Sequence, residues 1–141
     1  MSAIRPFHLA IAVNDLQQAR LFYGGKLGCV EGRSCSRWVD YDFFGHQLVC
    51  HLNPHGKSDN NMHNPVDNDA VPVPHFGVIL TMENWKTLRS KLEAAATDFV
   101  IKPRIRFEGK AGEQATMFLT DPSGNALEFK AFDDDKHIFE K

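Results

Sequence analysis

Two histidines and a glutamate occupy positions in the sequence where their side chains could bind a metal ion. His8 and His75 each lie in a short apolar run, and Glu128 stands in another apolar run close to the C-terminus. Two imidazoles and one carboxylate leave open positions on a divalent cation for substrate, oxygen or water, and they suit Fe(II), Mn(II), Zn(II) and Ni(II). A buried carboxylate without a partner is unfavourable by several kcal/mol, which a cation would offset. The sequence therefore predicts a catalytic metal site with His8, His75 and Glu128 as its protein ligands.

The first histidine belongs to a predicted β-strand over 7–13, in which side chains alternate between two faces. His8 shares one face with Ala10 and Ala12, and larger apolar side chains occupy the other. The pattern then indicates a helix and three further strands, at 15–27, 29–33, 36–44 and 46–53. These elements form one βαβββ module.

The second half of the chain repeats this module. Pro-His-Phe-Gly-Val-Ile resembles Pro-Phe-His-Leu-Ala-Ile closely enough to align His75 with His8, 67 positions apart. The predicted elements of the repeat are a strand, a helix and three strands, at 73–81, 83–96, 99–107, 113–120 and 125–132. By the same alternation, His75 shares a strand face with Gly77 and Ile79.

The predicted fold class is α+β, with two tandem βαβββ modules whose mixed sheets curl into a partly open barrel around the metal site. At 141 residues the chain has the usual length of one domain. We expect a single domain made of module 1, a linker or lid, module 2 and an acidic tail, at about 4–53, 54–71, 72–132 and 133–141. The linker is rich in Asn, Asp, Pro, His and Gly and has no hydrophobic period.

The strand pattern also yields a fourth candidate, His51. In the first module it is interpreted as standing at the place that Glu128 occupies in the second. A lone histidine in a strand is commonly a hydrogen-bonded structural residue. The shared parity of His8, His75 and Glu128 on corresponding strands favours metal binding for those three. For His51, the roles of ligand and of acid–base group both stay open.

Composition excludes several classes of partner. With 16 basic and 18 acidic residues the formal net charge is −2, and no basic stripe could neutralise a row of phosphates, so nucleic acid is not an expected partner. The sequence has neither an apolar signal segment nor a stretch long enough to span a bilayer, which predicts a cytoplasmic protein with no membrane partner. Its three cysteines form no Cys-x-x-Cys pair, so reduced thiols are expected, with Cys50 buried.

Three segments resemble the vicinal oxygen chelate superfamily, which includes glyoxalase I, methylmalonyl-CoA epimerase, type I extradiol dioxygenases, fosfomycin-resistance thiol transferases and bleomycin-binding proteins. They are Phe-His-Leu-Ala-Ile-Ala-Val-Asn-Asp-Leu, Pro-His-Phe-Gly-Val and Asp-Pro-Ser-Gly-Asn-Ala-Leu-Glu. The resemblance covers nearly the whole chain. It implies metal ligands at His8, His75 and Glu128, a small-molecule substrate and a homodimer.

Within this superfamily, the residue aligned with His51 separates subclasses. Glyoxalase I places a carboxylate there, the epimerase a glutamine, and the extradiol dioxygenases an acid–base histidine. The resemblance therefore implies an extradiol-type dioxygenase that cleaves a catechol-like ring with Fe(II), His51 being its catalytic acid–base group. Two features depart from that subclass, because this chain has Phe118 where a tyrosine is usual and Gly109 near the place of a further histidine.

Two alternatives have different chemistry. The first is a glyoxalase-type lyase or isomerase, in which Zn(II) or Ni(II) polarises a carbonyl and a nearby base moves a proton. The second is a binding protein that sequesters an aromatic antibiotic without metal or turnover. The residues that could contact substrate, each equally compatible with a structural role, are Trp38, Phe44, Phe107, Phe118, Arg37, Arg104 and Arg106.

Overall fold

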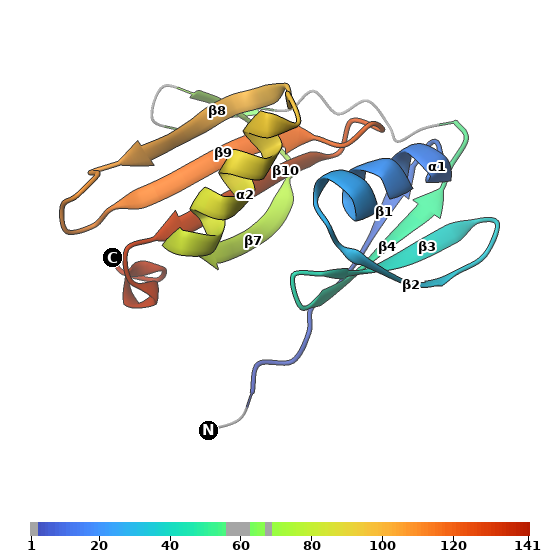
Figure 1. The fold of residues 1–141 in the computed structure, drawn as a ribbon, viewed down its shortest axis with the longest axis horizontal. Coiled ribbons are helices and arrows are strands. Elements are labelled where there is room, and N and C mark those ends of the chain that lie inside the picture. Colours follow the sequence, from blue (N-terminus) through green and yellow to red (C-terminus); the bar gives the residue numbers. More distant parts are fainter. Residues whose placement is uncertain (1–2, 56–62, 67–68) are drawn as a thin grey trace. The chain divides into compact units, whose positions relative to one another are not determined.

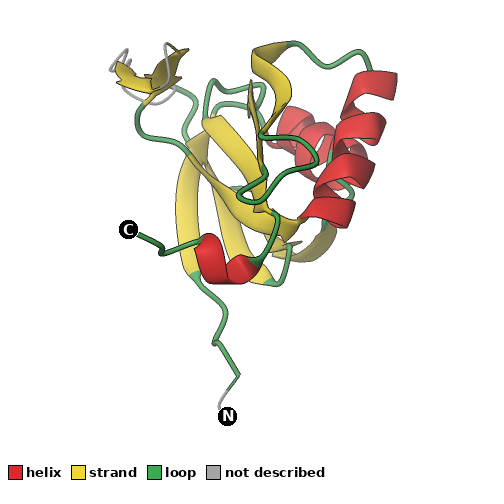
Figure 2. Cartoon of the chain, turned by 90° about the vertical axis from the view of Figure 1, so that its left-hand side faces the viewer, coloured by secondary structure: helices red, strands yellow, loops and turns green. Residues whose placement is uncertain are grey.

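The computed structural model describes residues 3–55, 63–66 and 69–141. The chain divides into two compact units. The first unit comprises residues 1–59 with 121–125, and the second comprises residues 60–120 with 126–141. Each unit holds one four-stranded mixed sheet, which confirms the predicted α+β class with two βαβββ modules. Figure 2 shows that strands make up most of the regular structure and that the helices are few.

The elements of the first unit follow the predicted order (Figure 1). They are β1 (His8–Val13), α1 (Leu16–Ala19), the π-helical segment η1 (Arg20–Lys26), β2 (Val30–Ser34), β3 (Trp38–Phe43) and β4 (His46–Leu52). The sheet order is β1-β4-β3-β2, in which β1 runs parallel to β4 and the other pairs are antiparallel. The predicted helix over 15–27 begins as α-helix, capped by the Asp15 carboxylate, and continues as η1.

The helical segment covers the apolar face of this sheet. Tyr23 of η1 and the sheet residues Val39, Leu48 and Cys50 are almost completely buried. Burial also raises the pKa of the Cys50 thiol to about 12, as expected for a cysteine that packs as a small apolar residue. The prediction that Cys50 is buried is confirmed.

A buried polar cluster joins the loop at 121–125 to the rest of the first unit. Asp121 is 4% exposed, and its carboxylate accepts hydrogen bonds from the Tyr23 hydroxyl at 2.8 Å and from the backbone N–H groups of Ser123 and Asn125 at 2.9 Å. The Asn125 amide donates to Asp121 and to the carbonyl oxygen of Ala12. The Asp-Pro-Ser-Gly-Asn motif therefore has a structural role, since every bond of its carboxylate stabilises the loop and η1.

The second unit has the same topology. It contains β7 (Phe76–Thr81), α2 (Met82–Ala94), β8 (Phe99–Arg106), β9 (Gln114–Thr120) and β10 (Ala126–Phe132), followed by the 3₁₀ turn η2 (Asp135–His137). Its sheet order is β7-β10-β9-β8, with β7 parallel to β10. Helix α2 lies along β7 and β10 (Figure 1), and the indole N–H of Trp85 donates to the carbonyl oxygen of Phe129 at 2.9 Å.

Part of the predicted linker is regular structure. β5 (His63–Val66) and β6 (Asp69–Pro72) pair in antiparallel fashion, two strands that the hydrophobic pattern of this segment did not predict. Backbone pairing forms this hairpin without the apolar alternation on which the prediction relied. The rest of the linker, at 56–62 and 67–68, lies outside the described residues. β7 begins at Phe76, later than predicted, and Pro74 just before it has no N–H to donate to a strand partner.

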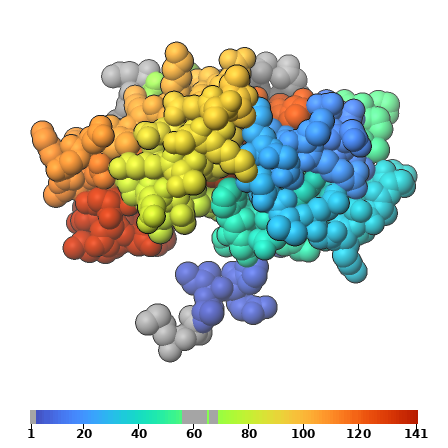
Figure 3. Space-filling view, viewed as in Figure 1, coloured from blue at the N-terminus to red at the C-terminus, as the bar shows by residue number. Residues whose placement is uncertain are grey.

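No helix within the described residues is both long enough and apolar enough to span a membrane. The first described residues, from Ala3 onward, extend away from the sheet of the first unit (Figures 1 and 3), and Ile4 is 93% exposed.

Candidate metal centre

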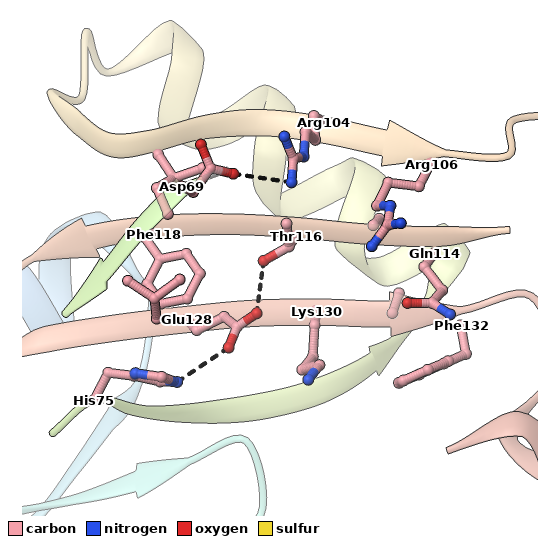
Figure 4. Close-up of a pocket in the computed structure, with 14 residues that line it drawn as sticks. Asp69, His75, Arg104, Arg106, Gln114, Thr116, Phe118, Glu128, Lys130 and Phe132 are labelled. Atoms are coloured by element: carbon pink, nitrogen blue, oxygen red, sulfur yellow. Dashed lines mark hydrogen bonds and ion pairs between the residues drawn. The ribbon is translucent and has the colours of Figure 1, made fainter. Parts of the chain in front are cut away.

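The register of the second sheet arranges side chains on one face in three rows. Because β10 is hydrogen-bonded on both sides, each row takes one residue from β7, one from β10 and one from β9. The rows are Gly77, Glu128 and Phe118, then Ile79, Lys130 and Thr116, then Thr81, Phe132 and Gln114. Figure 4 shows this face, with the acidic end near His75 and the cationic residues further along the strands.

His75 and Glu128 meet on this face. The Nε2 atom of His75 lies 3.2 Å from the Oε1 atom of Glu128, and the two side chains are 28% and 14% exposed. The Nδ1 atom of His75 lies 2.6 Å from the carbonyl oxygen of Pro72, so Nδ1 carries the proton in that hydrogen bond and donates it. This bond leaves Nε2, which faces the carboxylate, as the ring nitrogen that could accept a ligand.

The carboxylate of Glu128 is also held on its other side. The Thr116 hydroxyl donates to Oε2 at 2.7 Å, and the Phe118 ring packs edge-on against His75 with 5.0 Å between ring centroids. Metal-binding histidines and carboxylates are typically oriented in this way by outer partners. The donor atoms and their supports therefore fit a divalent cation bound between Nε2 and Oε1.

A glycine opposite Glu128 allows the two strands to approach closely. A Cβ atom added to Gly77 would lie 1.6 Å from the carbonyl oxygen of Glu128, a separation that no side chain tolerates. Gly77 therefore fixes the position of the Glu128 backbone against β7.

The first unit lacks the corresponding carboxylate. With His8 aligned to His75, Ala10 corresponds to Gly77, and the register pairs Ala10 with Val49 just as it pairs Gly77 with Glu128. His51 is opposite Ala12, two residues further along β4. The interpretation of His51 as the equivalent of Glu128 is therefore wrong. Positions 49 and 51 have the same parity, so alternation alone could not distinguish them.

His8 has the same kind of support as His75. Its Nδ1 atom lies 2.8 Å from Oε1 of the Gln47 side chain, which leaves Nε2 for a ligand. His8 belongs to the first unit, and the pair His75–Glu128 belongs to the second. Across the described residues, no group of three or more His, Cys, Asp or Glu side chains is gathered for a metal. The structure brings two of the predicted ligands together, and the complete triad stays a prediction.

A cavity of about 310 Å³ opens beside the His75–Glu128 pair, a size suited to a small ligand. It lies wholly within the second unit. Its lining includes Phe118, Arg104 and Arg106, three of the residues that the sequence suggested as possible substrate contacts. Other residues of its lining, such as Thr116 and Lys130, were not among the sequence candidates. Side-chain alternation could have identified them, because Lys130 is two residues after Glu128 in one strand and Thr116 is two residues before Phe118 in its neighbour, so all lie on one face.

Comparison with known proteins places this geometry in context. The family model described as the glyoxalase/bleomycin resistance protein/dioxygenase superfamily matches residues 5–129. A solved structure of a glyoxalase/bleomycin resistance protein/dioxygenase from Alicyclobacillus acidocaldarius is 36% identical, with 95% of this chain and 96% of that chain covered and a TM-score of 0.77. No curated protein matches the sequence.

Two more distant structures share the fold. Lactoylglutathione lyase from Agrobacterium tumefaciens is 18% identical, with coverage of 93% and 94% and a TM-score of 0.61. The fosfomycin resistance protein FosX from Listeria monocytogenes is 16% identical, with coverage of 93% of each chain and a TM-score of 0.62. At these identities the likeness concerns the fold alone.

Proposed function

The chain belongs to the glyoxalase/bleomycin resistance protein/dioxygenase superfamily, and from this premise we propose that it is an enzyme that uses a divalent metal ion to act on a small molecule. The observation that carries the proposal is the contact between Nε2 of His75 and Oε1 of Glu128, with each side chain fixed on its far side by a second partner. Such outer partners orient metal ligands and tune their basicity.

The third protein ligand in this proposal is His8. Its support is the alignment with His75, the strand parity, and a bond from Nδ1 to an oxygen atom that repeats the arrangement at His75. A bound divalent cation would polarise substrate oxygens and offer open positions for chelation. The chain's own residues orient the metal ligands. The Pro72 carbonyl oxygen holds the His75 ring, the Thr116 hydroxyl holds the Glu128 carboxylate, and the Phe118 ring packs edge-on against His75.

The reaction that we favour is cleavage of a catechol-like ring by oxygen, with Fe(II) as the metal. Two histidines and one carboxylate, with open positions, are the donor set of non-haem Fe(II) oxygenases. The resemblance to type I extradiol dioxygenases supports the same reaction. In this proposal His51 stays the acid–base group, and replacement of His51 by Ala should preserve bound metal and abolish turnover.

The second candidate is a glyoxalase-type lyase or isomerase that uses Zn(II) or Ni(II), and one observation weakens the ring-cleaving reaction relative to it. The position equivalent to Glu128 in the first unit is Val49, so the histidine typical of ring-cleaving enzymes is displaced by two residues. We further propose that the enzyme acts as a homodimer in the cytoplasm, on a small molecule rather than on nucleic acid or a membrane.

Metal analysis of anaerobically purified protein, followed by oxygen consumption with a panel of catechols, tests the proposal. Iron together with oxygen uptake would support ring cleavage. Zinc or nickel without uptake would support the lyase or isomerase. Protein that retains no metal, even after incubation with Fe(II), Mn(II), Zn(II) and Ni(II) in turn, would contradict a metal-dependent enzyme and favour the binding protein.

A further inference from the structure

Cationic side chains gather in the cavity of the second unit, beyond the metal-binding pair. Lys130 is two residues after Glu128 in β10 and therefore lies on the same face of the sheet. Arg104 and Arg106 reach the cavity from β8, where they alternate in the same way. Figure 4 shows Lys130 and Arg106 on the side of Glu128 away from His75.

Two of the charges in this cavity already have partners. An Nη atom of Arg104 lies 2.9 Å from the Asp69 carboxylate, and Glu128 is engaged by His75 and Thr116. Lys130 differs, because no carboxylate in the described part of the chain lies within ion-pair distance of its half-buried side chain. Its Nζ atom lies 5.8 Å from the centroid of the Phe132 ring. A partly desolvated ammonium without a counter-charge attracts an anion.

The spacing and the walls restrict what that anion is attached to. Residues two apart in a strand are separated by roughly 7 Å, so Lys130 is about that far from the metal-binding carboxylate along β10. The cavity lining also includes apolar side chains at both ends of this stretch, with Phe118 and Ile101 beside Glu128 and Phe132 beyond Lys130. A single aromatic ring with a substituent at each end spans the roughly 7 Å between Glu128 and Lys130.

We propose that the substrate is an aromatic oxyanion, whose ring lies against these walls and whose carboxylate or phosphonate group is bound by Lys130. This inference deepens the proposed function and rests on it, since the opposite end of the substrate carries the oxygens that chelate the metal. Arg106 lines the same end of the cavity.

Calorimetric titration of the full chain tests the anion site without reference to turnover. Benzoate, phenylphosphonate and neutral benzamide are titrated into metal-free protein. 3,4-Dihydroxybenzoate and catechol, which differ only in the carboxylate, are then titrated into anaerobic metal-loaded protein. We expect each acid to bind at least about tenfold more tightly than its neutral counterpart. A charge-assisted hydrogen bond in a partly buried site typically lowers the dissociation constant by at least that factor. The preference for benzoate or phenylphosphonate identifies the class of oxyanion.

Matched lysine variants assign the site. Lys130→Met should remove the preference for acids, whereas Lys102→Met, at an exposed position of β8 outside the cavity lining, should retain it. Lys130→Arg should restore the preference, and thermal unfolding confirms that each variant is folded. Equal affinity for acid and amide, failure of every acid to bind, or a preference that survives in Lys130→Met would overturn the inference. Acid preference in protein that binds no metal would support the anion site while contradicting the proposed metal-dependent function.

Discussion

The two units share one topology and one strand register but have different chemistry at the same position. Gly77 faces Glu128 in the second unit, and Ala10 faces Val49 in the first. The second unit thus combines a histidine, a carboxylate and the close approach of strands that Gly77 permits, while the first has His8 but no carboxylate at the paired position. A duplicated backbone can therefore preserve its pairing while only one copy retains the polar constellation.

The interiors of the units differ as well. The first unit buries a carboxylate and a tyrosine hydroxyl that bond to each other, whereas α2 of the second unit is anchored by the Trp85 indole on a strand carbonyl. Burial and the neighbouring Asp121 raise the pKa of Tyr23, and burial raises the pKa of Tyr41 to about 12. The second unit contains no tyrosine.

The largest expected effect follows from removal of a ligand in the second unit. Glu128→Ala and His75→Ala should each abolish stoichiometric metal binding, because one remaining side chain of the pair cannot retain the cation. Metal content after dialysis measures this, with Glu108→Gln as a control at an exposed position. His8→Ala should give the same loss if the first unit supplies the third ligand. Full metal retention in all three alanine variants would refute the predicted triad.

Loss of the buried carboxylate in the first unit should have the next largest effect. Asp121→Ala leaves the Tyr23 hydroxyl and two backbone N–H groups without acceptors, so we expect the free energy of unfolding to fall by about 3 kcal/mol. Tyr23→Phe removes one of these bonds and should cost about 1 kcal/mol. Urea denaturation measures both variants, and equal losses would mean that the tyrosine carries the whole effect.

The paired positions Gly77 and Ala10 offer a direct exchange between the units. Gly77→Ala should destabilise the protein by about 1–3 kcal/mol and weaken metal binding, because the added Cβ forces β7 away from Glu128. Ala10→Gly should cost only about 0.5–1 kcal/mol, through chain entropy, and leave metal binding unchanged. Thermal unfolding and metal titration distinguish the two, and comparable effects would show that the units are packed alike here.

Alkaline pH should weaken the first unit. Burial raises the pKa of Cys50 from 9.0 to about 12 and that of Tyr41 from 10.0 to about 12, so the neutral forms are favoured in the folded state. Their contribution is complete below pH 9 and is lost as the pH rises towards 12. Tyrosinate absorbance reports the first unit, and Trp85 fluorescence in a Trp38→Phe variant reports the second. If the Trp85 signal were lost at a lower pH than the tyrosine signal changes, the second unit would be the more alkali-sensitive one, contrary to this prediction.

Much of the fold was predictable from the sequence. Apolar and polar residues alternate along strands buried on one face, whereas apolar residues recur every three to four positions in helices. The segments predicted at 46–53 and 125–132 match β4 and β10 to within one residue at each end. Register was not predictable, because a shift of two residues preserves parity, and His51 was misplaced for that reason. The hairpin β5–β6 was missed because it has no apolar period.

The candidate site was partly predictable in the same sense. Two histidines and a carboxylate were identified by type and spacing, and the structure places His75 against Glu128. The support from Thr116 and the unpaired charge of Lys130 depend on which residues face each other across strands, which a single sequence does not encode.

The loop at 121–125 limits where the chain can be cut into two fragments. Its flanking strands, β9 and β10, belong to the second unit, but the loop itself belongs to the first. A fragment that ended before residue 60 would encode every strand and helix of the first unit and still omit the acceptor of the Tyr23 hydroxyl. The first half alone thus lacks part of its own interior, and we expect two separately expressed fragments to reassemble it only when the second fragment supplies Asp121.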